Sequence, residues 1–281
     1  ATGTPTVGKR SYEQIITAIV KRAMLSNGLS EAMTYSFESP KVFDKLLIPE
    51  DSDLRKAIPI MNPLGEDYSI MRTSSLNGML TSLATNYNRR NEEAGLFEVA
   101  KVYLPKAVPV TELPDEPRKL TFGMYGPNVD FFNAKGVTEY VAHVLGLDDK
   151  VEYTAKKDIP WMHPGRTAEI TVGDTVLGYV GEIHPLVAEN YNIGAKVYVA
   201  VMDMKALEDT AELVKKYKVL PKFPAVTRDI SLVVKDDVYV KDIEKCIKAN
   251  AGKILEKVTL FDVYQGSHIE KGFKSVSYSI M

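Results

Sequence analysis

Histidines are the first side chains to consider for acid–base chemistry near neutral pH, and the sequence contains four of them. His163 and His184 are each followed by proline, and Arg166 comes shortly after His163. These three side chains could line a small catalytic pocket if the fold brought them within hydrogen-bond reach of one substrate. Neither histidine has a carboxylate or a cysteine at metal-ligand spacing, so loop histidines ordered by the following proline are the simpler interpretation.

Other catalytic motifs are absent from the sequence. Cys246 is the single cysteine, and together with Ile243 and Ile247 it falls on the apolar side of a predicted helix, which is typical of a core residue rather than a nucleophile. We find no phosphate-binding glycine loop, no nucleophile elbow and no HExxH motif. The sequence therefore predicts no catalytic residue and no metal ligand.

Chemistry of another kind is predicted close to the C-terminus, where side chains alternate along two strand-like segments. Alternation along residues 257–264 puts Asp262 and Tyr264 on one side, with Phe261 facing a helix layer on the other. Alternation along residues 274–280 puts Ser275 and Ser277 on the same side as Tyr264. An aromatic ring among small hydrogen-bonding groups is the arrangement that reads unpaired bases by stacking and edge contacts. A solvated sheet face with a chance tyrosine is the alternative.

Basic side chains accompany these residues. Lys241, Lys245 and Lys248 share one face of a predicted helix, and Arg228 precedes the first strand of the same region. Such a cluster could contact the phosphates of RNA, although a basic helix face also serves solubility alone.

Apolar periodicity predicts the elements that must position these residues. Ser11 and Gln14 form a capping-box pattern before an apolar stripe at helical spacing, which ends at Asn27-Gly28. Further helices are predicted for residues 74–87 and 134–145, and a short one for residues 205–218. Period-two alternation predicts strands at residues 32–37, 96–103, 119–125, 167–172, 176–183 and 196–203, with a hairpin turn at Gly173-Asp174. Consecutive strands favour a largely antiparallel sheet and an α+β fold.

The C-terminal pattern is strand, helix, strand, strand, at residues 229–234, 240–251, 257–264 and 274–280. This βαββ order is the first part of a ferredoxin-like unit. We expect the unit to be incomplete at its C-terminus, which would leave an edge strand unpaired. The predicted domains are residues 1–204 and 225–281, joined by a proline-stiffened linker at 205–224.

Composition limits the classes of function. The chain has 281 residues, 45% hydrophobic and 26% charged, with a net charge of −2, which predicts no general affinity for DNA or membranes. No apolar stretch approaches the roughly 20 residues of a membrane helix, and no leader opens the chain, so we expect a cytoplasmic protein. The start at Ala1 without methionine indicates a sequence cut from a longer one.

Three ordered blocks, residues 223–230, 260–266 and 272–275, resemble the ferredoxin-fold anticodon-binding domain of the bacterial phenylalanyl-tRNA synthetase beta subunit. Residues 28–37, 71–76, 96–103 and 163–168 resemble the catalytic-like domain of the same subunit. The resemblance covers nearly the whole chain. It implies a class II synthetase-like antiparallel sheet with helices, followed by a truncated ferredoxin-like domain.

The resemblance also implies a function. The synthetase is an α2β2 tetramer that attaches phenylalanine to its tRNA using ATP and Mg²⁺, with catalysis in the alpha subunit. The catalytic-like beta domain would scaffold alpha without an active site or cofactor of its own. The helices at 11–26 and 74–87 could serve that interface or the core. The family's base-reading positions fall on Asp262, Tyr264 and Ser275, and Arg228 matches a family motif.

Some modules of the whole beta subunit are missing from this sequence. They are an OB-fold domain, an editing domain and a magnesium-binding helical module, so editing of mischarged tRNA is not expected from this chain. The alternative reading is a stand-alone RNA-binding or regulatory ferredoxin-like module on a scaffold domain.

Overall fold

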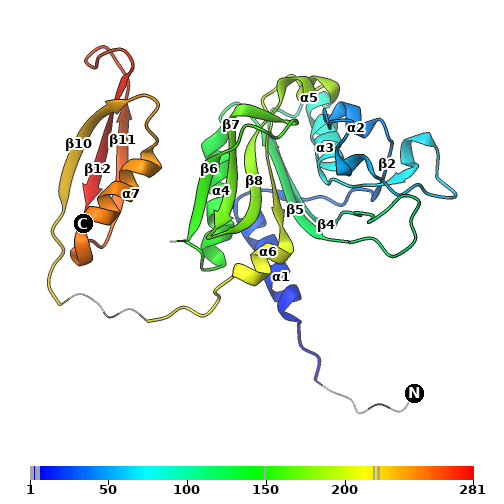
Figure 1. The fold of residues 1–281 in the computed structure, drawn as a ribbon, viewed down its shortest axis with the longest axis horizontal. Coiled ribbons are helices and arrows are strands. Elements are labelled where there is room, and N and C mark those ends of the chain that lie inside the picture. Colours follow the sequence, from blue (N-terminus) through cyan, green and yellow to red (C-terminus); the bar gives the residue numbers. More distant parts are fainter. Residues whose placement is uncertain (1–2, 4–6, 149, 218, 220–221) are drawn as a thin grey trace. The chain divides into compact units, whose positions relative to one another are not determined.

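The structure is a computed structural model, and it describes residues 3, 7–148, 150–217, 219 and 222–281. Its contacts divide the chain into two compact units, Ala1–Lys215 and Lys216–Met281 (Figure 1). Among the described residues, no helix has the length and apolar character that crossing a membrane requires. The predicted linker at 205–224 includes Lys218, Leu220 and Pro221, which lie outside the described residues.

A seven-stranded sheet forms the centre of unit 1, with the strand order β1-β4-β5-β9-β8-β7-β6. Neighbouring strands are antiparallel, except that β1 runs parallel to β4. The strands are β1 (Ser30–Glu31), β4 (Ala94–Lys101), β5 (Arg118–Tyr125), β6 (Val151–Ala155), β7 (Met162–Val172), β8 (Thr175–Ile183) and β9 (Tyr198–Asp203). A second, two-stranded sheet pairs β2 (Phe37–Glu38) with β3 (Ile70–Met71).

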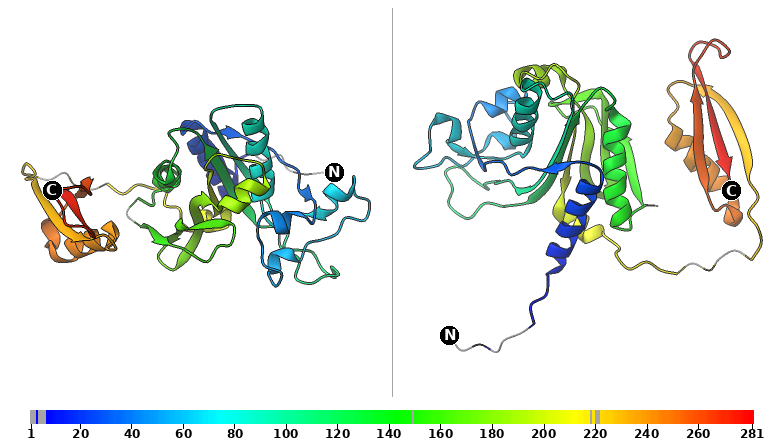
Figure 2. Two further views of the ribbon diagram at one scale, coloured as in Figure 1. Left: turned by 90° about the horizontal axis from the view of Figure 1, so that it is seen from above. Right: turned by 180° about the vertical axis from the view of Figure 1, so that it is seen from behind.

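Helices cover both faces of the large sheet, as Figure 2 shows. One face packs against α1 (Tyr12–Ser26), α4 (Phe131–Val144) and α6 (Met204–Thr210). The other packs against α3 (Leu76–Asn88), together with α2 (Val42–Lys45) and α5 (Pro185–Asn190). Two 3-10 turns, Asp53–Arg55 and Glu66–Tyr68, lie in the connection between β2 and β3. The prediction of an α+β fold with a mainly antiparallel sheet is confirmed.

Local signals account for the first helix. Ser11 accepts a hydrogen bond from the Gln14 amide, and the Gln14 side chain returns one to the Ser11 amide, so the predicted capping box is present. Gly28 has a φ of 81°, the left-handed conformation that stops the helix. The inward residues Ile16 and Val20 are completely buried.

Most of the apolar residues of the α1 and α3 stripes belong to the core. Leu76, Leu80 and Leu83 are as inaccessible to solvent as Ile16. Of the two roles left open for these stripes, burial against the sheet therefore accounts for most of their residues, while Tyr12 and Ile15 of α1 lie at the surface.

Two predicted elements of unit 1 are wrong. Residues 32–37 do not form one strand, because the Thr34 amide donates to the side chain of Glu98 instead of to a neighbouring backbone. The helix predicted for 205–218 ends at Thr210, where the next residue is extended and the Glu212 amide donates to the Leu145 carbonyl at 2.7 Å. Residue 218 of that prediction is outside the described residues.

Unit 2 is a three-stranded antiparallel sheet with one helix along one face (Figure 1). The strands β10 (Arg228–Lys235), β12 (Phe273–Ile280) and β11 (Val258–Tyr264) are adjacent in that order. Helix α7 (Val240–Asn250) packs Ile243 onto Val276 and Tyr278, and a 3-10 turn (Gly252–Ile254) follows it. The predicted βαββ order is confirmed.

Two side-chain placements predicted for unit 2 are wrong. Phe261 does not point at the helix layer by simple alternation, because the register of β11 shifts between Leu260 and Asp262 and Phe261 is the additional residue. It is largely exposed. Cys246 is exposed rather than buried, because it lies at the margin of the apolar stripe that Ile243 centres.

A buried carboxyl group connects β2, α3 and α5 in unit 1. Asn77 donates to Glu38 Oε2 at 3.0 Å, and the Tyr191 hydroxyl donates to Asn77 Oδ1 at 2.8 Å. Burial raises the pKa of Glu38 to about 7, against the lowering effects of Asn77 and Arg72. The folded chain therefore keeps a proton on Glu38 over a range of pH in which the unfolded chain has lost it.

This difference predicts a pH-dependent stability. Between about pH 4.5 and about pH 7, the unfolded chain releases the Glu38 proton while the folded chain still holds it. The free energy of unfolding therefore falls as pH rises through that window. We expect Glu38→Gln to stabilise the chain relative to wild type at pH 8, by on the order of 2–3 kcal/mol, and by much less at pH 4.5. Urea unfolding at both pH values measures the effect. Glu50→Gln, at an exposed glutamate, is the control, and an E38Q difference independent of pH would contradict the prediction.

Candidate functional site

The strand pairing of unit 2 brings the predicted base-reading residues together. Asp262 is paired with Ser277, and Tyr264 is paired with Ser275, so all four side chains lie on one side of the sheet. Val276 and Tyr278, which alternate with the two serines on β12, pack against α7. The four polar residues therefore lie on the side away from the helix, which we call the open face.

The open face has the chemistry of a stacking platform. Tyr264 is 39% exposed, so part of its ring can accept a planar base while its backbone stays in the sheet. The hydroxyls of Ser231 and Ser277 contact each other at 2.8 Å across neighbouring strands, and Ser277 is buried, so this contact joins β10 to β12 without adding exposed surface at Ser277. A carboxylate and several hydroxyls next to one aromatic ring can hydrogen-bond the edges of that base.

The predicted phosphate contacts do not lie on this face. Lys241, Lys245 and Lys248 are on the side of α7 opposite to Ile243, which packs onto the sheet. Arg228 pairs with Ile280, a residue of the helix-covered side, and its guanidinium donates to the Thr227 carbonyl at 3.0 Å. A helix that covers one face of a sheet carries its polar side away from the other face, so these four residues and Tyr264 are on opposite sides of unit 2.

The histidines of unit 1 make local contacts. His163 Nδ1 accepts from the Gly165 amide at 3.1 Å, and His184 Nδ1 accepts from the Leu186 amide at 3.2 Å at the start of α5. Arg166 donates to the buried Glu182 at 2.8 Å. The two histidines thus bond backbone amides two residues away, whereas Arg166 joins β7 to Glu182 of β8. His163 lies within β7 rather than in a loop, and His184 caps α5.

A cavity of about 350 Å³ lies on the α3 side of the large sheet in unit 1. Its charged groups are paired with each other, because Lys119 Nζ lies 2.6 Å from Asp203 Oδ2. Trp161 donates to the Tyr179 hydroxyl at 2.9 Å, and burial raises the pKa of Tyr179, which keeps this phenol neutral. Among the described residues that line the cavity, neither a spare cation for phosphates nor a cluster of acidic metal ligands is available, so these residues do not fit ATP with its metal ion.

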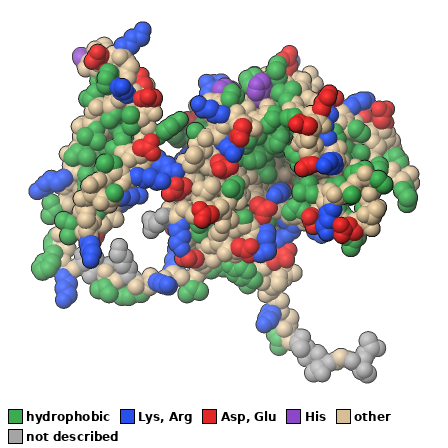
Figure 3. Space-filling view, viewed as in Figure 1, with side chains coloured by type: hydrophobic (Ala, Val, Ile, Leu, Met, Phe, Trp, Pro, Cys, Tyr) green, Lys and Arg blue, Asp and Glu red, His purple; other side chains and the backbone are tan. Residues whose placement is uncertain are grey.

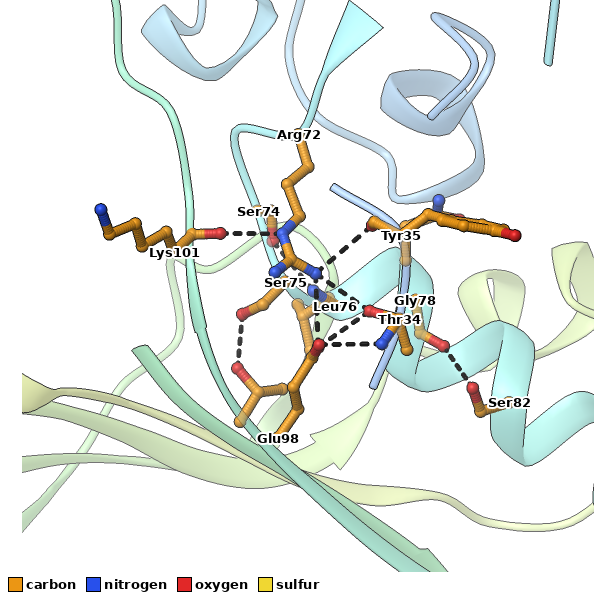
Figure 4. Close-up of polar contacts among 12 residues, drawn as sticks. Thr34, Tyr35, Arg72, Ser74, Ser75, Leu76, Gly78, Ser82, Glu98 and Lys101 are labelled. Carbon is orange, nitrogen blue, oxygen red and sulfur yellow. Dashed lines mark hydrogen bonds and ion pairs between the residues drawn. The ribbon is translucent and has the colours of Figure 1, made fainter. Parts of the chain in front are cut away.

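The most extensive buried polar contact in unit 1 joins Arg72 and Glu98 (Figure 4). Arg72 Nη1 lies 3.3 Å from Glu98 Oε2 and 2.9 Å from Thr34 Oγ1, and Arg72 Nε donates to the Lys101 carbonyl at 2.8 Å. Glu98 in turn accepts from the amide and the hydroxyl of Thr34, at 2.9 and 2.8 Å. We call these contacts the Arg72 network. Both charged side chains are nearly inaccessible to solvent.

The Arg72 network holds Thr34 inward and so turns its neighbours outward. Met33 is 94% exposed and Tyr35 is 68% exposed, on either side of the buried hydrogen bonds of Thr34. Gly78 of α3 permits this arrangement, because a Cβ at that position would lie 2.4 Å from Thr34 Oγ1. The buried Arg72–Glu98 pair, whose charges are costly to remove from water, therefore fixes an extended segment that exposes Met33 and Tyr35 to solvent.

Further apolar side chains lie beside this segment. Tyr68 contacts Tyr35 edge to face, with ring centroids 5.7 Å apart, and Met61 and Leu64 are exposed in the loop that precedes Tyr68. We call Met33, Tyr35, Met61, Leu64 and Tyr68 the exposed apolar patch. Figure 3 shows hydrophobic side chains at the surface on this side of unit 1. Patches of Met and Tyr are typical of protein–protein interfaces.

Sequence reasoning did not single out Arg72 or Glu98. The sequence did contain a sign of this buried pair. Glu98 interrupts the apolar run of β4, and Arg72 directly follows Ile70 and Met71, of which Ile70 is buried. A charged residue within a buried strand needs a partner of opposite charge. The partner could not be identified from spacing alone.

Comparisons with protein families assign both units. Residues 1–204 match the model of the phenylalanyl tRNA synthetase beta chain CLM domain, and residues 221–281 match the ferredoxin-fold anticodon binding domain. By fold alone, the chain resembles the pyrrolysyl-tRNA synthetase of Desulfitobacterium hafniense, with a TM-score of 0.58 and 15% identity over 70% of this chain and 68% of that one.

Curated relatives agree with the family models. The chain is 50% identical to the phenylalanine–tRNA ligase beta subunit of Clostridium acetobutylicum and 47% identical to that of Clostridium tetani. Each alignment covers 97% of this chain and 34% of the relative. The beta subunit of Symbiobacterium thermophilum is 36% identical, over 98% of this chain and 32% of its own length. The chain thus spans about a third of the length of the curated relatives it matches.

The Arg72 network predicts a large stability effect. Arg72→Met would leave the Glu98 carboxylate buried without its cation, which should cost about 3–5 kcal/mol of unfolding free energy. Adding Glu98→Gln should recover part of that loss, because the neutral amide still accepts from Thr34. Urea denaturation of the single and double variants measures the coupling. Lys106→Met, which breaks the exposed pair with Glu112, should change stability far less, and additive effects of R72M and E98Q would contradict the prediction.

Proposed function

The chain belongs to the phenylalanyl-tRNA synthetase beta chain family, and from this premise we propose that it is a non-catalytic part of phenylalanine–tRNA ligase that contacts the anticodon of the phenylalanine tRNA and scaffolds the alpha subunit. The whole enzyme would join phenylalanine to its tRNA using ATP and Mg²⁺ as an α2β2 tetramer. The cavity of unit 1, with its internally paired Lys119 and Asp203, supports placing the chemistry on another chain.

One observation carries the anticodon proposal. Asp262 and Tyr264 on β11 and Ser275 on the neighbouring strand β12 share the open face of the unit that matches an anticodon-binding domain. We propose that Tyr264 stacks on an anticodon base and that Asp262 and Ser275 bond base edges. RNA bound on this face would be out of reach of the α7 lysines. For these lysines to contact phosphates, the RNA strand would have to continue around unit 2 to the helix side.

The exposed apolar patch supports the scaffolding proposal. Met33 and Tyr35 are held outward by the Arg72 network, whereas most apolar residues of the α1 and α3 stripes are used in the core. We propose that the alpha subunit contacts this patch. A Tyr side chain on a rigid backbone has few rotatable bonds to immobilise, and Met33 adds a large adaptable apolar surface, which favours affinity.

The domain limits in this proposal are residues 1–204 for the scaffold, 205–224 for the linker and 225–281 for the anticodon-binding domain. A cytoplasmic location follows from the proposed role in protein synthesis. A stand-alone RNA-binding module on a scaffold would share the open face but would have no use for the apolar patch.

Replacement of the stacking tyrosine tests the anticodon proposal. Within the whole beta subunit in complex with alpha, Tyr264→Ala should weaken binding of the phenylalanine tRNA by about 5- to 150-fold, the equivalent of about 1–3 kcal/mol of stacking. Tyr264→Phe should bind nearly as wild type because it keeps the ring. The measurement is the dissociation constant for the tRNA and for the same tRNA with a changed anticodon.

The matched control is Tyr239→Ala, which removes an exposed tyrosine that precedes α7 and lies outside the sheet. It should leave tRNA affinity unchanged. If Y264A bound tRNA as tightly as Y239A does, stacking of an anticodon base on Tyr264 would be wrong.

A second test concerns the alpha subunit. Tyr35→Ser combined with Met33→Ser should weaken association of beta with alpha at least tenfold, because two large apolar anchors are removed from the interface. Both side chains are exposed, so the folded beta chain should keep its thermal stability. Leu113→Ser, at an exposed leucine in the loop after β4, serves as the control. Unchanged co-purification and an unchanged dissociation constant for alpha would exclude the patch as the contact.

A further inference from the structure

The cavity on the α3 side of the large sheet is bounded by two partly buried aromatic side chains, Trp161 and Tyr179. Their ring centroids are 6.4 Å apart, and their planes are inclined by 56°. Leu54, Val102 and Val201 contribute apolar surface to the same walls. A volume of about 350 Å³ is within the range of small-molecule sites, which are mostly apolar and contain few polar groups. We call this space the Trp161 cavity.

The hydroxyl of Tyr179 carries a proton that no described residue accepts. Its oxygen accepts from Trp161 Nε1 at 2.9 Å, and because an indole can only donate, the phenol proton is not used in this bond. Burial raises the pKa of Tyr179, which keeps the proton on the oxygen. A phenol withdrawn from solvent normally donates to an acceptor, so a molecule in the cavity should supply one.

Two other hydroxyls of the cavity wall are already paired within the chain. Thr73 donates to the Leu54 carbonyl at 2.6 Å. The hydroxyls of Ser75 and Thr121 bond each other beside the start of α3, where Figure 4 shows Ser75. These two hydroxyls therefore need no ligand, in contrast to that of Tyr179.

The charged residues of the wall favour a neutral ligand. Lys119 Nζ lies 2.6 Å from Asp203 Oδ2, and Asp203 Oδ1 accepts from the Ala206 amide at 2.9 Å at the start of α6. An anion near Lys119 would be repelled by Asp203, and a cation near Asp203 would be repelled by Lys119. A charged ligand would thus leave water without gaining a partner of its own, which is costly.

From these features we propose that the Trp161 cavity binds a small neutral aromatic molecule with a carbonyl group, which accepts the Tyr179 proton while its ring packs against Trp161. Water between mainly apolar walls keeps few hydrogen bonds, so its displacement by an aromatic ring is favourable. The ligand would contact β8, β9 and the segment before β7 together, and it would stabilise the folded form of unit 1.

Trp161 is the single tryptophan of the chain, so its fluorescence reports on this cavity. Benzamide, a neutral ring with a carbonyl group, should change that fluorescence saturably, with a dissociation constant of about 1 mM or lower. It should also raise the midpoint of thermal unfolding. Benzoate has nearly the same shape but carries a negative charge, and it should do neither at the same concentrations.

Tyr179→Phe separates the hydrogen bond from the packing. The variant keeps the ring, so toluene, which has no carbonyl, should bind as tightly as to wild type. Benzamide affinity should fall about 2- to 12-fold, the effect of one hydrogen bond. Because the variant also removes the acceptor of Trp161, equilibrium dialysis replaces fluorescence in this comparison. Tyr239→Phe, at an exposed tyrosine of unit 2, is the control and should leave both affinities unchanged.

Filling the cavity tests its location. Val201→Phe adds a ring to the cavity wall and should abolish binding of benzamide and toluene, with a cooperative thermal transition showing that the variant is folded. The proposal would be overturned if benzamide did not bind saturably, if benzoate bound as tightly, or if Y179F kept the full affinity for benzamide. Wild-type affinity in a folded V201F would overturn it as well.

Discussion

The need to cover apolar sheet faces decides what each unit of this chain can do. In unit 1 the seven-stranded sheet has an apolar cluster on each face, and helices cover most of both, leaving a cavity of about 350 Å³ on the α3 side whose charged groups pair with each other. In unit 2 the three-stranded sheet is apolar on one face only, and α7 covers that face. The open face carries serines, an aspartate and a tyrosine, which need no cover and can meet RNA.

Within unit 1, the cost of burying charge explains why two large apolar side chains are held at the surface. Arg72 and Glu98 are removed from water, and that cost is offset only because Thr34 and the Lys101 carbonyl complete their hydrogen bonds. The same bonds prevent residues 32–37 from joining the sheet as a regular strand. The rigid, outward Met33 and Tyr35 are thus a consequence of satisfying a buried ion pair.

The sequence was a good guide wherever structure depends on neighbours along the chain. The α1 capping box, the Gly28 stop, the hairpin at Gly173 and the alternation of β12 could all be recognised from a few adjacent residues. It was a poor guide where a distant segment intervenes. The bulge at Phe261 depends on how β12 pairs with β11, and the end of α6 depends on a carbonyl at Leu145.

By itself, the sequence determined the elements, the family and the side of the strands on which Asp262, Tyr264 and Ser275 lie, because periodicity and motifs are local properties of the chain. The tertiary structure alone decided that Phe261 leaves the alternation at a bulge, that Cys246 is exposed, and that Arg72 pairs with Glu98. Burial is determined by which segments meet in space, and an apolar stripe on a helix has the same pattern whether the chain itself or a partner covers it.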